Sequence, residues 1–239
     1  MTGWSEHNES QRRYFEDRPL PRMVPVRSPY LLRHVEELVR FARLVPGERV
    51  LEIGSGMGRY TLLLADSGLS LEGMDLSPVL LERLRAYGGG LHKMPLHAFD
   101  VAEPPSDLKG RFGAVIGLFT LHHLHDLEAC YRGMAQLLAP GGRVAFLEPN
   151  ALNPLYYLQI IFTPGMTWKG DGGMVRMRRG PVFRAMAAAG FQELRLERFG
   201  FFPPFLANRP AGRRLERLLE RVPPFRPILP FQLFGGTLG

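Results

Sequence analysis

The chain has 239 residues, 45% of them hydrophobic, and a formal net charge of +7. This size predicts a single α/β domain over residues 1–239, and no repeat or low-complexity tract indicates a second domain. No apolar stretch reaches the ~18 residues needed to cross a bilayer, and residues 1–17 are too polar for a signal segment, so a cytoplasmic protein is expected.

Residues 1–47 precede the first predicted strand and are expected to form an N-terminal lid that contains a helix. They include the aromatic pair Tyr14 and Phe15, followed by a stretch over residues 25–29 that is bounded by prolines. Apolar residues then recur at helical spacing over residues 30–44, which predicts a helix there.

A glycine-rich turn occupies residues 50–60, where an apolar strand leads into three alternating glycines and the start of a helix. Glycine allows positive φ and lets a ligand approach the backbone, and the free N–H groups at a helix start favour an anion. The spacing differs from the dinucleotide pattern Gly-x-Gly-x-x-Gly, and a plain tight turn is the alternative. The residues of this turn expected to contact a cofactor are Glu52, Gly54, Ser55, Gly56 and Gly58.

Two further predicted strands end in acids. Residues 69–75 end in Asp75, ahead of a Ser-Pro pair that is typical of a helix start. An aspartate about 20 residues beyond the glycines can accept both ribose hydroxyls of a nucleoside, although capping a turn is the alternative role. Residues 96–101 repeat the pattern with Asp100. The neighbouring residues Leu76 and Val101 are expected to join the two acids in the cofactor site.

The fourth predicted strand, residues 112–119, is almost entirely apolar, as expected for a strand covered on both faces. Leu118 and Phe119 at its end complete the expected cofactor contacts. A helix capped by Asp126 and a fifth strand over residues 143–148 follow. Strand and helix therefore alternate through this part of the chain.

Residues 48–150 resemble the class I S-adenosylmethionine (SAM) dependent methyltransferases, in the small-molecule group. The glycine turn, the two acids and the Leu-Leu-Ala-Pro-Gly-Gly-Arg sequence at residues 137–143 occur in that family's order. The resemblance implies an α/β, Rossmann-like fold: a seven-stranded, mostly parallel sheet with helices on both faces and ligands at the carboxyl ends of the strands. It implies SAM as the cofactor and S-adenosylhomocysteine as its product, with Asp75 on the ribose and Asp100 facing the adenine amino group. It also implies that residues 1–47 fold over the cofactor, with Tyr14 among its contacts.

Two insertions after this core are expected to shape the acceptor pocket. Residues 151–180 are rich in aromatics, and a connection of this length in a compact domain is usually a lid. Residues 200–227 combine phenylalanines with a helix expected over about residues 211–222. The elements expected between and after them are a helix over 181–189 and strands over 191–199 and 228–238.

Positive charge is concentrated in residues 176–226, which hold twelve arginines, no lysine and four glutamates. An anionic acceptor, an acidic carrier protein or an anionic membrane surface fits such a block, and an ordinary solvated face is the alternative. The helix over about residues 211–222 has leucines on one face and arginines elsewhere, which suits peripheral membrane contact, although such a stripe more often docks on its own domain. No recognition helix, zinc module or stacking sheet accompanies the block, so no nucleic-acid partner is expected.

Methyl transfer mainly requires that the acceptor atom be held in line with the methyl group. An oxygen, nitrogen or activated carbon acceptor must also lose a proton, and histidine suits that task near neutral pH. His122, His123 and His125 follow the fourth strand, at the edge where the acceptor is expected. We take His123 as the nominal general base and His122 as the second candidate, with a purely structural role as the alternative for both.

No metal is expected, because adjacent His122 and His123 would point in opposite directions on a strand and no paired-acid magnesium set is evident. The sequence therefore predicts SAM-dependent methyl transfer to a small or lipophilic metabolite, with O-methylation favoured over N- or C-methylation. The alternative is a SAM-fold protein that binds a partner or catalyses a reaction without methyl transfer. An RNA methyltransferase fits less well, because no Asn/Asp-Pro-Pro-aromatic motif follows the fourth strand.

Overall fold

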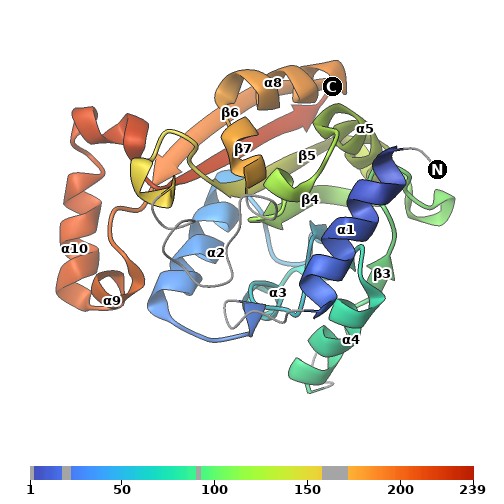
Figure 1. Ribbon diagram of the computed structural model, residues 1–239, viewed down its shortest axis with the longest axis horizontal. Helices are drawn as coiled ribbons and strands as arrows, with labels where there is room; N and C mark the ends of the chain where they lie inside the picture. The colour runs from blue at the N-terminus through green and yellow to red at the C-terminus, as the bar shows by residue number, and fades with distance from the viewer. Residues whose placement is uncertain (1–2, 18–22, 90–92, 158–171) are drawn as a thin grey trace.

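The computed structural model describes residues 3–17, 23–89, 93–157 and 172–239 (Figure 1). Its strands form one seven-stranded sheet in the order β3-β2-β1-β4-β5-β7-β6. The first five strands of this order run parallel, and β7 is antiparallel to both of its neighbours. The Rossmann-like α/β fold and the mostly parallel sheet are confirmed. The single-domain organisation over residues 1–239 stays a prediction, although every described strand belongs to this sheet.

Most strands lie where the sequence places them. Their bounds are β1 Arg49–Ile53, β2 Ser70–Asp75, β3 Leu96–Ala98, β4 Phe112–Leu118, β5 Leu138–Pro149, β6 Phe191–Phe199 and β7 Phe231–Leu238. β5 begins earlier than expected, because Leu138 already pairs with Phe112, and the register shifts before the next pair, Ala114 with Arg143. β7 begins later than expected, because a 3₁₀ helix occupies Pro223–Ile228.

Three of the described helices begin at a capping side chain, and the sequence suggests two of these caps, Ser77 and Asp126. Ser77 and Asp126 each accept a hydrogen bond from a backbone N–H three residues on, at 3.1 and 3.0 Å, and Ser28 does the same for the helix that follows it. The longer helices are α1 Gly3–Asp17, α2 Pro29–Ala42, α4 Pro78–Tyr87, α5 Leu127–Leu137, α8 Arg179–Ala188 and α10 Pro210–Leu219. The short ones are α3 Thr61–Ala65 and α9 Pro204–Ala207.

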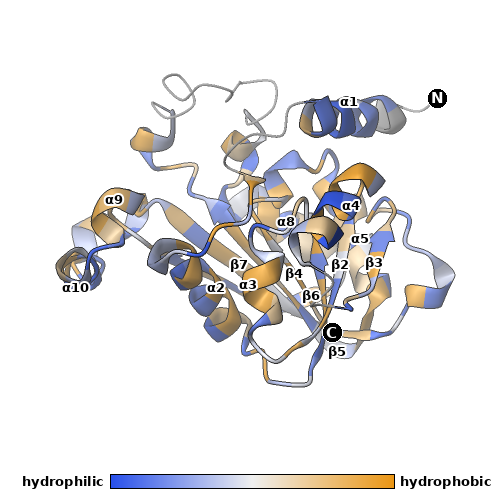
Figure 2. Cartoon of the chain, turned by 90° about the horizontal axis from the view of Figure 1, so that it is seen from below, coloured by the Kyte–Doolittle hydropathy of each residue, from blue (hydrophilic) through white to orange (hydrophobic). Residues whose placement is uncertain are grey.

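Both faces of the sheet are buried. Neighbouring residues of one strand enter opposite cores: Leu51 belongs to the core that includes α5 and α8, whereas Val50 belongs to the core that includes α2 and α3. Val115 and Ile116 alternate in the same way on β4. Figure 2 shows the central strands as predominantly hydrophobic. This two-sided burial explains why these strands read as continuous apolar runs and not as alternating ones.

Two segments lie outside the helical layers. α1 lies apart from the sheet in Figure 2, and α9 and α10 extend from one end of the molecule in Figure 1. The predicted lid insertion, residues 151–180, falls partly outside the described residues, since 158–171 are not described. Within the described parts of the chain, no helix is long and apolar enough to cross a membrane.

Candidate cofactor and acceptor site

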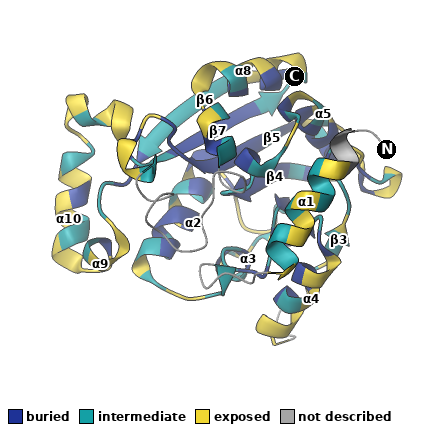
Figure 3. Ribbon diagram, in the orientation of Figure 1, coloured by how far each residue is buried: buried dark blue, intermediate teal, exposed yellow. Residues whose placement is uncertain are grey.

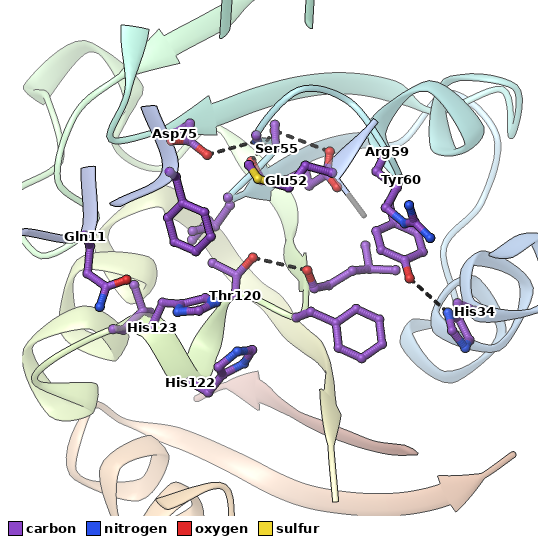
Figure 4. A pocket seen from close by; sticks show the side chains of 18 of the residues that line it. Gln11, His34, Glu52, Ser55, Arg59, Tyr60, Asp75, Thr120, His122 and His123 are labelled. Atoms are coloured by element: carbon purple, nitrogen blue, oxygen red, sulfur yellow. Dashed lines mark hydrogen bonds between the residues drawn. The ribbon is translucent and has the colours of Figure 1, made fainter. Parts of the chain in front are cut away.

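A cavity of about 660 Å³ opens at the carboxyl ends of β1, β2 and β4. Figure 4 shows Glu52 and Asp75 on one wall, with His34 and His123 on opposite sides of the space. Among the site residues expected from the sequence, Tyr14 and Gly58 are not part of the lining. Those that line the cavity are Glu52, Gly54, Ser55, Gly56, Asp75, Leu76, Asp100, Val101, Leu118, Phe119, His122 and His123.

At the glycine turn, backbone that carries no side chain at Gly54 and Gly56 lines the cavity. The N–H groups of Gly54 and Ser55 donate to Met74 O at 2.8 and 3.0 Å, which ties the turn to β2. A side chain at Gly54 would collide with Thr120. Gly56 has φ +51°, and no atom lies within 4 Å of where its Cβ would be. The backbone at Gly56 is therefore open to a ligand, as a cofactor-binding turn requires.

Glu52 lies beneath this turn and is almost fully buried. Burial raises the pKa of its carboxyl group to about 7, against the opposing effect of hydrogen bonds from Thr61 and Ser55, while the charge of Asp75 raises it further. Ser55 Oγ lies 3.3 Å from Glu52 Oε2. The charge of Glu52 thus changes near neutral pH, and a cationic ligand group nearby would favour the ionised form.

Asp75 accepts two backbone hydrogen bonds at the end of β2. Its Oδ2 accepts from Gly56 N and its Oδ1 from Ser77 N, both at 2.9 Å. Burial raises the pKa of the Asp75 carboxyl, and these two N–H groups oppose that shift. Asp75 therefore caps a turn and also lines the cavity, so the two roles considered from the sequence are compatible.

α1 covers the part of the cavity that contains the two acids. Asn8 Nδ2 donates to Asp100 Oδ2, and Ser77 Oγ donates to Glu16 Oε1 at 2.5 Å. Gln11 also lines the cavity, and its buried Oε1 has no hydrogen-bond partner among the described residues. A ligand that offers an N–H group here would satisfy this oxygen.

A buried histidine–carboxylate pair follows β4. His122 Nδ1 lies 2.6 Å from Glu148 Oε2 at the end of β5, and both side chains are almost fully buried. Glu148 Oε1 also accepts the backbone N–H groups of Thr120 and Leu121, at 2.9 and 2.6 Å. The carboxylate therefore fixes both the loop and the orientation of the His122 ring, an arrangement used to orient general bases. Glu148 belongs to no sequence motif identified above, although it too is an acid that ends an apolar strand.

His123 faces α1. Its ring lies 3.9 Å from that of His122, centroid to centroid, and meets the ring of Phe15 edge-on at 5.1 Å. The carbonyl oxygen of His123 accepts a hydrogen bond from His7 Nε2 at 3.1 Å. The predicted N-terminal lid thus contacts the post-β4 loop as well as the acids.

The opposite end of the cavity holds His34, which no sequence motif identified. His34 Nδ1 lies 3.0 Å from Tyr60 Oη, and the rings of Tyr30, Phe119 and Phe231 surround it at centroid distances of 4.5, 5.6 and 4.5 Å. Burial, reinforced by nearby arginine charges, lowers the pKa of His34 to about 3. His34 is therefore neutral at physiological pH and acts as a hydrogen-bonding group, not as a base.

This end of the cavity is largely aromatic and carries one notable cation. Arg59 lines it and, within the described parts of the chain, forms no ion pair. The chain regions that complete this wall come from the two predicted insertions and β7. They contribute Asn153, Leu155, Tyr156, Phe201, Phe202, Pro203, Pro204, Pro230 and Phe231. The described residues contain no group of three or more histidine, cysteine or acidic side chains placed to hold a metal ion.

Fold and site together define a Rossmann-like protein with a ligand cavity at the switch point of its sheet. Residues 27–196 match a protein family described as a methyltransferase domain. The chain belongs to this methyltransferase family, and the family predicted from the sequence is confirmed.

Individual relatives agree with this assignment. The chain is 32% identical to a ubiquinone biosynthesis O-methyltransferase of Bordetella avium over 145 residues, 60% of this chain and 56% of the relative. It therefore spans just over half the length of that curated relative. Among solved structures, it resembles the [4+2]-cyclase SpnF with a TM-score of 0.62 at 18% identity, covering 87% of this chain and 80% of the other. A phosphoethanolamine N-methyltransferase 2 of Haemonchus contortus, solved with SAM, has a TM-score of 0.60 at 16% identity, covering 86% and 52%.

Proposed function

We propose that this protein transfers a methyl group from SAM to an oxygen of a small, largely apolar acceptor. One observation carries the proposal: a single cavity joins the glycine turn and both acids to a buried histidine and an aromatic end. The ubiquinone biosynthesis O-methyltransferases support an oxygen acceptor, and the aromatic wall supports an apolar one.

The residues present fit SAM on one side of the cavity. The open backbone at Gly56 leaves room for the ligand, and Asp75, which lines the cavity, would accept the ribose hydroxyls. Asp100 and the unpartnered Gln11 oxygen, which lie beneath α1, suit the adenine amino group. SAM supplies a methyl group that is already activated on a sulfonium. The protein then has to orient the acceptor and remove its proton.

We assign proton removal to His122. Glu148 holds Nδ1 of its ring, so Nε2 is the nitrogen that would take the proton from the acceptor hydroxyl. The oxygen forms its new bond to the methyl carbon as the sulfur–carbon bond breaks, and the sulfur keeps that electron pair. His123, the nominal base from the sequence, packs on Phe15 of α1 and would instead form the cavity wall.

The first experiment tests both the reaction and the base. The purified protein is incubated with methyl-labelled SAM and an extract of lipophilic metabolites, and a single labelled product is sought. His122→Gln should lower the rate of product formation about 10²- to 10⁴-fold, the usual contribution of a general base, while SAM affinity changes little. His123→Gln is the control and should retain most of the rate.

Two results would contradict this assignment. Equal rates in His122→Gln and the wild type would remove His122 from the chemistry. Tight SAM binding without any labelled product would favour the alternative of a SAM-fold enzyme that does not methylate, for which the fold shared with the [4+2]-cyclase SpnF gives a precedent.

A second experiment tests the cofactor side. Asp75→Ala should weaken SAM binding by about 1–3 kcal/mol, roughly 5- to 150-fold, because two hydroxyls lose a charged acceptor. Calorimetric titration measures the affinity, with the exposed Asp107→Ala as the control. If Asp75→Ala folds and binds SAM as the wild type does, Asp75 only caps the turn.

A further inference from the structure

α10 and the residues that follow it present apolar side chains to solvent. Leu215, Leu218 and Val222 are 49%, 60% and 37% exposed, and Phe205 in the preceding helix is also exposed. The spacing of three residues places Leu215 and Leu218 on one face of the helix, and Val222 lies three residues beyond its end. We call these three residues the apolar ridge. Figure 3 shows the exposed positions along α10.

The inner face of α10 is polar, the reverse of an ordinary surface helix. Glu216 is 2% exposed and pairs with Arg33 of α2. Glu216 Oε1 also accepts the backbone N–H groups of Phe201 and Phe202, at 2.7 and 2.8 Å. Glu220 binds Arg33 Nη2 at 2.7 Å. Charged contacts therefore dock the helix on the domain and leave the apolar ridge facing outward.

Arginines border the apolar ridge. Arg214, Arg217 and Arg221 are exposed, and each directly precedes one residue of the ridge in the sequence. None of the three forms an ion pair within the part of the chain that the structure describes. An apolar strip beside unpaired arginines matches the boundary between anionic lipid headgroups and acyl chains. A second copy of this chain would bring these like charges together, which disfavours self-association.

The same segment forms part of the cavity wall. Phe201, Phe202, Pro203 and Pro204 line the aromatic end of the cavity and lead directly into α9. Because Glu216 of α10 holds the backbone of Phe201 and Phe202, the outward helix and the cavity wall form one hydrogen-bonded unit. A surface that binds α10 would therefore adjoin the acceptor end of the cavity.

We infer that α10 docks this protein on an anionic lipid bilayer. The arginines contact lipid phosphates, and the apolar ridge inserts among the upper acyl segments. This inference goes beyond the proposed function, and its test needs no acceptor and no turnover.

Flotation with lipid vesicles tests the inference. The wild type should float with vesicles of phosphatidylcholine and phosphatidylglycerol, and much less with phosphatidylcholine alone. The triple variant R214Q/R217Q/R221Q should bind the anionic vesicles roughly 100-fold more weakly, because each basic residue near such a surface contributes about fivefold. L215Q/L218Q should also lose binding, although its charge is unchanged.

A matched variant distinguishes membrane binding through the α10 surface from binding that depends only on the net charge of the protein. R178Q/R179Q/R184Q removes the same charge from exposed positions at α8 and should float like the wild type. Equal losses in this control would mean that only total charge matters, and would overturn the inference. Wild-type protein that does not float, L215Q/L218Q that floats normally, or a lipid-free dimer broken by L215Q/L218Q would each overturn it as well.

Discussion

Replacing Gly56 with valine is expected to abolish SAM binding while the domain still folds. Gly56 has φ +51°, where an L-residue loses about 1–2 kcal/mol and a β-branched one is especially disfavoured. The valine methyl groups would also project into the space that is empty around the Gly56 Cβ position and that the ligand needs. Calorimetry with SAM gives the affinity, and thermal unfolding gives the cost in stability.

Gly110→Val separates the effect of backbone strain from the effect of filling the space that the ligand needs. Gly110 has φ +68° and an equally open Cβ position, but it does not line the cavity. The control should therefore lose similar stability and still bind SAM. Normal SAM affinity in a folded Gly56→Val protein would show that the turn is structural and that the cofactor does not approach it.

The elements that the sequence predicted well are those specified by local patterns. β1, β2 and β4 are short, largely buried strands, and glycine or an acid marks the ends of β1 and β2. Asp126 marks the start of α5. α1 was not assigned a range within the N-terminal lid, because residues 3–17 carry no clear apolar stripe. Its described contacts are largely polar ones to distant residues, such as Asn8 to Asp100.

The candidate site residues likewise divide into those that a local sequence pattern marks and those that depend on contacts with distant residues. Gly54, Gly56, Asp75 and Asp100 line the cavity, and the sequence marks them through the glycine turn and through acids that end predicted strands. Glu148 also ends an apolar strand, but its role, like that of His34, depends on a partner far along the chain: Glu148 pairs with His122, and His34 with Tyr60. In the sequence, His34 is only a polar residue within an apolar helical face.

The orientation of α10 could not be predicted from the sequence. The spacing of its leucines predicted an apolar face but not which way that face points. The direction is set by Arg33, a residue of α2 that lies far from α10 in the sequence and binds two acids, Glu216 and Glu220, at once.

Arg33→Met is therefore expected to lower the free energy of unfolding by about 3–5 kcal/mol, because Glu216 would remain buried without its cation. Arg33 is 10% exposed and Glu216 is 2% exposed, so water screens the pair little. Urea unfolding measures the loss, and hydrogen exchange should show α10 amides opening first, since Arg33 holds that helix to α2.

Arg40→Met is the matched control on the same helix. Arg40 is 56% exposed and pairs with Glu37 and Glu197, at 3.0 and 2.6 Å, so its loss should cost less than about 1 kcal/mol. If both variants lose equally little, the buried cluster does not hold α10 in place, and the outward direction of the apolar ridge must have another cause. If α10 opens selectively in Arg33→Met, the buried Arg33 cation is what keeps the apolar ridge of α10 facing outward.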